Sequence, residues 1–403
     1  MSIINQVHIE AFKSLEDLTI DLGHVNVFVG ANGSGKSNIL EALGVLAAAA
    51  DGRVDDNSLL RHGVRPGMPS LYKCAFPGRR SPHIQFMACQ TTGKNIEYKV
   101  TLFNPIKNPG ESWLYHTERL GEKSKYPIVS RSHHNSSKTD NKIGLAALKA
   151  AESAIDDENF LLLRYLQQYF IYTPVSSILR GTIPDSQQFP PIGLSGGRLP
   201  EAVSELLKAK KLQGEAGERI KTICRETLLM IDWIKGYGTR NAEDLIAKSV
   251  PTTAKVIRFV DKYMHEKRNA LSGYDASEGA LYVLFHAVLA GHPLAPRFYA
   301  VDNADHSLNP RLCRELFKHI CEWNLTSPTP RQVLLTTHNP LALDGLPLKD
   351  DRVRLFTVSR SNKGKTIVER VVWNNQLQQM SQKGWTVSRL WTSGELGGMP
   401  NGF

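Results

Sequence analysis

Residues 30–38 form a glycine-rich string whose residue types and spacing favour phosphate binding. Gly30, Gly35, Lys36 and Ser37 fit the pattern G-x-x-x-x-G-K-[ST], in which glycines let successive backbone N–H groups turn inward around a phosphate. In such a loop the lysine reaches the β- and γ-phosphates, and the serine hydroxyl binds Mg²⁺. The sequence therefore predicts a site for ATP and Mg²⁺. The residues expected to contact the nucleotide here are Asn32, Gly33, Ser34, Gly35, Lys36, Ser37 and Asn38.

The residues on both sides of this string predict the elements that would position it. A β-branched apolar run, residues 25–29, comes before it, and apolar residues at helical spacing follow it from Ile39 to Leu46. A buried strand would thus lead into the loop, and a helix N-terminus would add its dipole to the anion site. The alternative, a glycine-rich turn that binds nothing, is disfavoured because strand, loop and helix are all in register.

A second apolar run ends in an acid. Residues 298–301 are Phe-Tyr-Ala-Val, and Asp302 follows them. This pattern predicts a Walker B strand whose carboxylate holds the Mg²⁺ shell, so Ser37 and Asp302 are the expected metal ligands.

Composition narrows the class of protein and its partners. The chain has 403 residues, of which 41% are hydrophobic and 22% charged, as in a globular protein of two or three domains. No apolar run approaches a membrane span and the start lacks a signal-peptide pattern, so a cytoplasmic protein without membrane contact is expected. Five cysteines without a C-x-x-C pair argue against a zinc site or a disulfide framework. The net charge of +10 favours nucleic acid or another anionic partner.

Hydrophobic periodicity predicts the order of elements along the chain. A hairpin is expected over residues 7–22, three strands over 70–76, 83–89 and 96–103, and a loop excursion over 119–142 in which His133 and His134 are solvated. Helices are expected over 145–169 and 200–234, with a short strand from Phe170 between them. The later expectations are strands at 256–264, 298–302, 332–338, 353–358 and 367–372, and helices at 277–290 and 310–323. Strands that alternate with helices predict an α/β fold with a largely parallel sheet and its ligand at the carboxyl ends of the strands.

Three strings together resemble the SMC, RecF and OLD-type branch of ABC ATPases. They are a strand ending in Phe12-Lys13-Ser14 before V-G-A-N-G-S-G-K-S-N, the string Asp302 to Arg311, which is similar to D-E-P-E-x-x-L-H-P-R, and Thr336-Thr-His338-Asn-Pro340. The resemblance covers about residues 1–50 and 255–375. It implies an ABC-type P-loop core with a mixed, largely parallel sheet, an antiparallel β subdomain and an inserted helical lobe. It also implies that Lys13 lies near the ATP phosphates and that His338 contacts the γ-phosphate.

The departures from the family pattern are informative. Asn303 stands where the family places the glutamate that activates the attacking water. An amide can orient a water but cannot accept its proton, and a general base contributes about 10²- to 10⁴-fold to a rate. Slow ATP hydrolysis is therefore expected, with Asp302, Asn303 and His338 as the catalytic set, unless Asp305 or His306 substitutes as base.

The signature motif of the family has two candidates in this chain. Leu194-Ser-Gly-Gly197 looks like the L-S-G-G tetrapeptide, whereas Ser277-Glu-Gly279 looks like a degenerate S-[DE]-G form. In the family a single helix separates the signature from Walker B, and Ser277 precedes Asp302 by 25 residues, against 107 for Ser195. Ser277 and Gly279 are therefore the predicted signature, which in this family serves a phosphate of the opposite subunit.

The resemblance implies an ATPase that clamps ATP between two copies of itself, as a homodimer or a higher homo-oligomer. The predicted domains are residues 1–118, with the phosphate loop and the β subdomain, 119–253, a mainly helical inserted lobe, and 254–403, with the other motifs and a tail. Short relatives without a coiled-coil arm often act in bacterial anti-phage defence or DNA repair. The expected role is a sensor or scaffold for a separately encoded effector, such as a TOPRIM-like or HNH nuclease, triggered by DNA or a phage protein.

Four other functions compete with this interpretation. A RecF-like repair ATPase would act directly on DNA, and a non-hydrolysing scaffold would hold ATP as a structural ligand, which Asn303 favours. A self-contained OLD-type nuclease would need a TOPRIM domain, for which the 65 residues after His338 are too few. A transporter subunit is disfavoured by the hairpin before the phosphate loop and by the string around Asp302.

Overall fold

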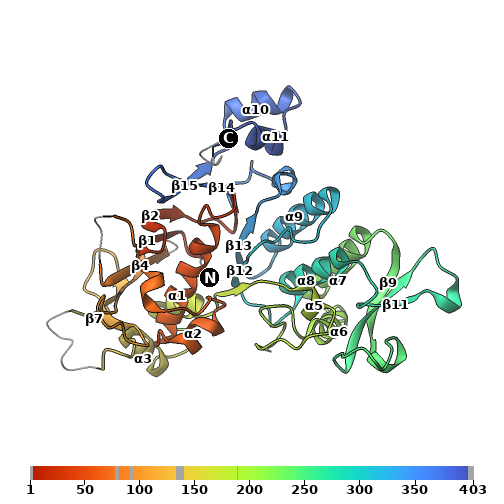
Figure 1. The fold of residues 1–403 in the computed structure, drawn as a ribbon, viewed down its shortest axis with the longest axis horizontal. Coiled ribbons are helices and arrows are strands. Elements are labelled where there is room, and N and C mark those ends of the chain that lie inside the picture. The colour runs from red at the N-terminus through yellow and green to blue at the C-terminus, as the bar shows by residue number, and fades with distance from the viewer. Residues whose placement is uncertain (1–2, 78–80, 91–94, 133–139, 188, 398–403) are drawn as a thin grey trace.

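The structure, a computed structural model, describes residues 3–77, 81–90, 95–132, 140–187 and 189–397. Its core is a six-stranded central sheet with the order β15-β14-β3-β13-β12-β8 (Figure 1). Five of these strands are parallel, and β15 pairs antiparallel with β14 at one edge. The strands are β3 (Val25–Val29), β8 (Phe170–Tyr172), β12 (Phe298–Val301), β13 (Gln332–Thr337), β14 (Val353–Arg360) and β15 (Thr366–Val371).

A second six-stranded sheet, here called the antiparallel sheet, lies beside the first on the N-terminal side of the molecule (Figure 1). Its order is β2-β1-β4-β5-β6-β7, with all neighbours antiparallel. Its strands are β1 (Gln6–Phe12), β2 (Leu15–Asp21), β4 (His83–Gln90), β5 (Ile96–Phe103), β6 (Leu114–Glu122) and β7 (Val129–Arg131).

Both faces of the central sheet are covered, which explains why every residue of β3 is buried. On one face, Phe28 joins a hydrophobic core with α1 (Lys36–Asp51), α4 (Leu161–Gln167) and the antiparallel sheet. On the other face, Val25, Val27 and Val29 join a second core with the four helices named next. These are α6 (Leu199–Ala209), α7 (Glu215–Met230), α8 (Glu278–Gly291) and α9 (Pro310–Leu325).

A three-stranded sheet, here called the distal sheet, packs on α6 and α7 at the far end of the molecule (Figure 1). Its order is β11-β10-β9, with β9 (Ile234–Asn241), β10 (Lys255–Asp261) and β11 (Ala270–Ser272). The other helices are α2 (Asp56–Arg61), α3 (Leu145–Glu152), α5 (Ser176–Leu179), α10 (Asn375–Gln382) and α11 (Val387–Thr392), with 3-10 turns η1 (Pro69–Tyr72), η3 (Glu158–Phe160), η4 (Ala242–Asp244), η5 (Glu266–Arg268) and η6 (Pro340–Gly345).

The expected α/β fold with a largely parallel sheet and an antiparallel β subdomain is confirmed. The N-terminal hairpin, the strand before the phosphate loop and the helix after it are also present. The closing hairpin is confirmed as β14 and β15.

Several local expectations were wrong. Residues 70–76 do not form a strand, because Pro69 starts a 3-10 turn and only an isolated bridge joins Lys73 to Phe12. The presumed excursion over 119–142 instead contains the end of β6 and all of β7. His133 and His134 lie outside the described residues.

The prediction of one continuous helix over residues 145–169 and another over residues 200–234 was also wrong. Residues 145–169 divide into α3, η3 and α4, since the polar stretch 153–159 interrupts the helical pattern. Residues 200–234 divide into α6 and α7 around Gly214, and β9 begins at Ile234. Residues 119–253 contribute strands to all three sheets, and the three-domain division stays a prediction. Every helix in the described ranges is too short or too polar to span a membrane.

Candidate nucleotide-binding site

The carboxyl ends of β3, β12 and β13 lie side by side because these strands are parallel neighbours in the central sheet. The phosphate loop follows β3, Asp302 follows β12, and His338 follows β13. The topology therefore brings the three strings to one edge of the sheet, where ligands of open parallel sheets bind.

The loop between β3 and α1 needs its glycines for two different reasons. A Cβ on Gly30 would lie 2.1 Å from the carbonyl oxygen of Val358, so only glycine lets the loop pass β14. Gly35 has φ +110° and a Cβ there would lie 2.1 Å from Thr366 Oγ1. The β14–β15 hairpin also fixes the loop, because Thr366 donates to Ser34 O (2.9 Å) and Arg360 Nε donates to Gly33 O (2.8 Å).

Lys36 begins α1 with its ammonium group lying over the loop. Its Nζ donates to the carbonyl oxygens of Gly30 (2.8 Å) and Ala31 (3.0 Å). Burial lowers the pKa of Lys36, while Asp302 and Asp305 act to raise it. A buried cation between a backbone loop and two carboxylates has the position and charge to bind phosphates.

Ser37 and Asp302 meet although 265 residues separate them in the chain. Ser37 Oγ donates to Asp302 Oδ2 at 2.9 Å, and Thr336 Oγ1 donates to Asp302 Oδ1 at 2.5 Å. A hydroxyl and a carboxylate are hard oxygen ligands that suit Mg²⁺, which takes the rest of its shell from phosphates and waters. The pair therefore fits an Mg–ATP complex. Among the described residues no cluster of three or more His, Cys, Asp or Glu side chains forms another metal site.

Asn303 and Asp305 lie in contrasting environments just after Asp302. Asn303 is exposed at φ +54°, and its N–H donates to Thr336 Oγ1 (2.8 Å). The side chain of Asp305 is buried, with Oδ2 3.6 Å from Nδ1 of the half-exposed His338. The other oxygen of Asp305 is buried and has no hydrogen-bond partner among the described residues. The buried carboxylate is thus a second candidate for the proton acceptor that Asn303 cannot be.

The basic residue before the phosphate loop has a partner that the sequence did not reveal. Lys13 Nζ forms an ion pair with the buried carboxylate of Glu41 on α1, and Arg65 Nε donates to the same carboxylate at 2.6 Å. The Glu41 hydrogen bond raises the pKa of Arg65, with a smaller contribution from Asp302. Arg65 is therefore a further cation near Asp302, and its loop carried no motif by which to find it.

Asn38 and Ser14 connect the first hairpin to the phosphate loop. Asn38 Nδ2 donates to Ser14 Oγ at 2.7 Å, and Ser14 also contacts Thr366 Oγ1 at 2.8 Å. Asn32 and Gly33 stay exposed at the tip of the loop. Of the predicted site residues, those of the loop, Lys13, Asp302, Asn303 and His338 are thus gathered at this edge of the sheet.

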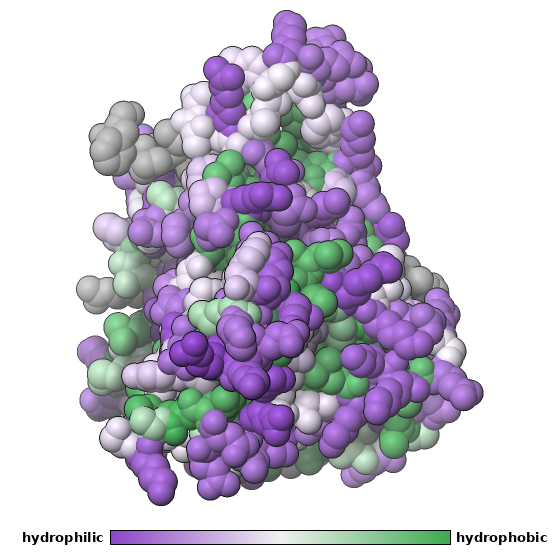
Figure 2. All heavy atoms as spheres, turned by 90° about the vertical axis from the view of Figure 1, so that its right-hand side faces the viewer, coloured by the Kyte–Doolittle hydropathy of each residue, from purple (hydrophilic) through white to green (hydrophobic). Residues whose placement is uncertain are grey.

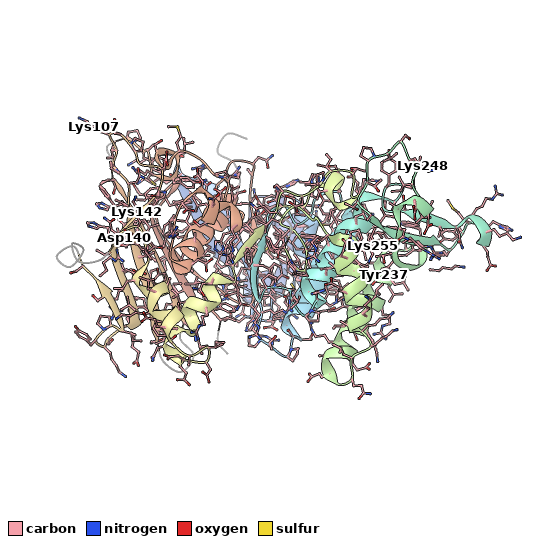
Figure 3. All side chains as sticks on the ribbon, turned by 90° about the horizontal axis from the view of Figure 1, so that it is seen from below. Lys107, Asp140, Lys142, Tyr237, Lys248 and Lys255 are labelled. Carbon is pink, nitrogen blue, oxygen red and sulfur yellow. The ribbon has the colours of Figure 1, made fainter. Side chains whose placement is uncertain are left out.

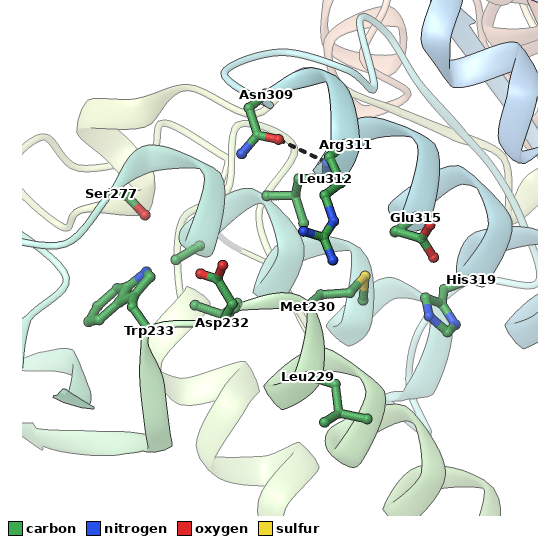
Figure 4. A pocket seen from close by; sticks show the side chains of 12 residues that line it. Leu229, Met230, Asp232, Trp233, Ser277, Asn309, Arg311, Leu312, Glu315 and His319 are labelled. Carbon is green, nitrogen blue, oxygen red and sulfur yellow. Dashed lines mark hydrogen bonds between the residues drawn. The ribbon is translucent and has the colours of Figure 1, made fainter. Parts of the chain in front are cut away.

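Ser277 and Gly279 stand elsewhere, at the N-terminus of α8. Ser277 is the exposed N-cap residue and makes no capping hydrogen bond through its side chain. It lines a pocket of about 320 Å³ together with Asn309, Arg311 and Trp233 (Figure 4). Asn309 caps α9 by accepting from the N–H of Leu312 (2.9 Å). The hydroxyl of Ser277 and the helix N-terminus are therefore exposed at a pocket mouth, where an anion could bind.

The backbone N–H groups of the other signature candidate, the loop around Ser195, already bind a carboxylate of the same chain. The N–H groups of Ser195 and Gly197 donate to Asp185 Oδ2 at 3.1 and 3.0 Å. Gly196 has φ +99°, and a Cβ on Gly197 would lie 2.3 Å from Asp185 Cβ. The glycines of this loop thus enclose a carboxylate of the same chain. The choice of Ser277 as signature stays a prediction.

Comparison with known proteins identifies the family of the chain. A family model described as "AAA domain, putative AbiEii toxin, Type IV TA system" matches residues 25–344. The chain is also similar to the DNA replication and repair protein RecF from Renibacterium salmoninarum, with 41% identity over 68 residues. That match spans 16% of this chain and 17% of the relative.

Two solved head domains match most of the chain. One of them is the Smc head domain with an extended coiled coil from Pyrococcus furiosus, which was solved bound to the C-terminal domain of ScpA. It has a TM-score of 0.51 and 13% identity to this chain. The match covers 96% of this chain and 100% of that one. The SMC head domain from Thermotoga maritima has a TM-score of 0.46 and 14% identity, and the match covers 92% and 99% of the two chains. At this identity the first likeness shows the fold alone.

Proposed function

The chain belongs to the family described as "AAA domain, putative AbiEii toxin, Type IV TA system", and from this premise we propose that it is an ABC-type ATPase of the RecF and SMC kind that acts as an ATP-loaded sensor or scaffold. In this proposal two or more copies associate around ATP and hold a separately encoded effector, such as a TOPRIM-like or HNH nuclease, in anti-phage defence. The observation that carries it is a complete phosphate and Mg²⁺ site next to Asn303, an amide at the water-activating position.

The proposed division of roles follows from the chemistry of each side chain. Lys36 binds the β- and γ-phosphates, while Ser37 and Asp302 hold Mg²⁺, which neutralises phosphate charge when bound. Asn303 orients a water without accepting its proton, and His338 contacts the γ-phosphate. ATP then stays bound for long periods, which suits a state that is held until a trigger arrives.

Replacement of Asn303 by glutamate is expected to raise ATP turnover by about tenfold or more, because it restores a general base. The side chain is exposed, so a longer residue fits. The backbone at φ +54° tolerates asparagine better than glutamate, and a loss of stability of about 1 kcal/mol is expected. Steady-state phosphate release and thermal unfolding measure the two effects.

The structure supplies the competing outcome for this experiment. Asp305 has a buried unpartnered oxygen and lies beside His338. If the wild type hydrolyses ATP at several per second and Asp305→Ala abolishes it, then Asp305 supplies the base and the proposed role of Asn303 is wrong. Asp305→Asn serves as the isosteric control, since it keeps the volume of the buried side chain.

Any nucleic-acid cleavage is expected to come from the partner, because the described residues hold no metal-binding cluster besides the proposed Ser37–Asp302 pair. The purified chain, incubated with plasmid, ATP and Mg²⁺ or Mn²⁺, should leave the plasmid intact. Adding the product of the neighbouring gene should produce cutting. Robust cutting by the chain alone, lost on mutation of residues 119–253, would place a nuclease site in this protein.

A second candidate function is a RecF-like ATPase that acts directly on DNA in repair. It is favoured by the similarity to RecF and by the net charge of +10. We also propose a cytoplasmic location, where ATP and an intracellular trigger are both present. A scaffold that never hydrolyses ATP differs from the main proposal only in rate, so the turnover of the wild type, measured as the baseline of the Asn303→Glu experiment, separates the two.

A further inference from the structure

The distal sheet carries a disproportionate share of the positive charge. From the start of β9 to the end of β11, residues 234–272 include eight Lys and Arg against four Asp and Glu. About a tenth of the chain thus supplies four of its ten net positive charges. Figure 2, which faces this end of the molecule, shows a mostly hydrophilic surface with several hydrophobic patches.

The loop between β10 and β11, here called the distal tip, is exposed over seven consecutive residues, 262–268. Lys262, Lys267 and Arg268 have no carboxylate within ion-pair distance among the residues that the structure describes. Tyr263 is 78% exposed, and Lys262 Nζ lies 4.9 Å from its ring centroid. An exposed aromatic ring among cations without ion-pair partners suits contact with a polyanion whose grooves admit a side chain.

A hydrogen-bonded turn fixes the shape of the distal tip. The carboxylate of Asp261, which is buried, accepts from the N–H groups of Tyr263 (2.7 Å) and Met264 (3.1 Å). One of the four acids in the segment is therefore occupied by the backbone. These two hydrogen bonds hold the backbone at the start of the tip, where Tyr263 lies.

The same cationic character continues on one face of the distal sheet. Arg258 on β10 lies opposite Gly238, and Arg240 on β9 lies opposite Val256, which places both arginines on one face. Gly236 and Gly238 have open space where a Cβ would stand. The two arginines make no ion pair with any described carboxylate. A bare strand beside unpaired guanidinium groups lets a phosphate backbone approach closely.

We propose that the distal sheet and its tip form a binding surface for duplex DNA, with contacts to the phosphate backbone and with Tyr263 entering a groove. Nucleic acid fits better than an acidic protein because the cations without ion-pair partners are spread along a face and a projecting tip, as a phosphate backbone requires. Backbone contacts of this kind give affinity without sequence readout. The inference deepens the proposed function, since it names the polyanion partner and the surface that contacts it.

The test compares charge reversal at the distal tip with matched reversal at the opposite end. The tip variant is Lys262→Glu, Lys267→Glu and Arg268→Glu. The control variant is Lys107→Glu, Lys123→Glu and Lys142→Glu, three exposed residues at the other end of the molecule. Figure 3 shows Lys107 and Lys142 at the end opposite to Lys248 and Lys255. Fluorescence anisotropy with a labelled DNA duplex, repeated over a range of salt concentrations, measures affinity and its salt dependence.

The tip variant is expected to bind DNA at least about tenfold more weakly than the wild type. The slope of log affinity against log salt concentration should become shallower by about three, while both quantities change little in the control. Tyr263→Ala is expected to weaken binding about fivefold or more without changing the salt slope, because a ring in the groove carries no charge, and Tyr263→Phe should retain affinity. Equal losses in tip and control variants would overturn the proposal in favour of diffuse charge. Stronger binding of duplex RNA, or equal competition by polyglutamate of matched charge, would overturn the assignment to DNA.

Nucleotide binding is measured on the same proteins to keep the two proposals apart. The tip variant should bind ATP as the wild type does. Lys36→Ala should still bind DNA in the absence of nucleotide. If the tip variant loses DNA binding and the wild type does not bind ATP, the distal surface is supported as the DNA-binding surface. The proposal of an ATP-loaded sensor is then refuted.

Discussion

Replacing Lys36 by alanine is expected to weaken ATP binding by at least about 100-fold. Truncating one partner of a buried, hydrogen-bonded charge pair costs about 2–5 kcal/mol, and the ammonium of Lys36 is the buried cation of the phosphate loop. Isothermal titration with ATP and Mg²⁺ measures the loss. Lys107→Ala, at an exposed position outside the phosphate loop, is the control and should bind ATP normally.

Thermal unfolding without nucleotide separates loss of binding from loss of fold. Burial lowers the pKa of Lys36, so the folded protein carries this charge at a cost that alanine removes. The same substitution removes two hydrogen bonds to carbonyls of the loop. The free energy of unfolding of the variant is therefore expected to differ from that of the wild type by no more than about 1–2 kcal/mol. Undiminished ATP affinity in a folded Lys36→Ala protein would mean that the loop does not bind the phosphates.

Replacing Ser277 by arginine is expected to abolish ATP-driven association. The proposed dimer places the N-terminus of α8 against a phosphate of the opposite subunit, and a long side chain at this exposed position would occupy that space. Light scattering should show a larger species with ATP than without it for the wild type, and one unchanged mass for the variant. ATP binding by the isolated subunit should persist, because Ser277 lies apart from the phosphate loop.

Two further serines make this experiment specific. Ser124→Arg, at an exposed turn of the antiparallel sheet, should associate like the wild type. Ser195→Arg tests the rival signature, and its melting temperature must be compared because this loop holds Asp185. Normal association of Ser277→Arg together with loss in a stably folded Ser195→Arg protein would show that the signature is the L-S-G-G string.

The two predictions address different steps of the same proposal. Lys36 determines whether ATP is bound by one subunit, and Ser277 determines whether bound ATP joins two subunits. A protein that binds ATP without associating would retain the nucleotide site and lose the proposed assembly. The partner assay and the DNA assay can then be interpreted with a known nucleotide and oligomeric state.

The sequence alone determined those parts of the site that are local in the chain. The phosphate loop could be predicted because its glycines, Lys36 and Ser37 are contiguous and because a buried strand and a helix must flank them. The strands before Asp302 and His338 could be predicted for the same reason, since short apolar runs ending in polar residues are typical of buried parallel strands. The family resemblance then supplied their common fold.

Patterns that depend on distant partners could not be predicted. In the distal sheet, the strand expected at 256–264 corresponds to β10, which ends at Asp261. Its neighbour β9 was missed because it reads Ile-Lys-Gly-Tyr-Gly-Thr-Arg-Asn, with glycines where a strand signal needs β-branched residues. β6 and β7 were missed because polar residues of an antiparallel sheet face solvent and look like a loop. In both cases pairing with a neighbouring strand, which propensity does not encode, decides the structure.

The contacts that complete the site were decided by the tertiary structure. Ser37 meets Asp302 only because β3, β13 and β12 are adjacent parallel strands. Glu41 joins Lys13 to Arg65, and Asp305 lies beside His338, through packing between segments without a common motif. Local spacing can specify a loop that binds phosphate, whereas the electrostatic environment of that loop depends on which strands become neighbours.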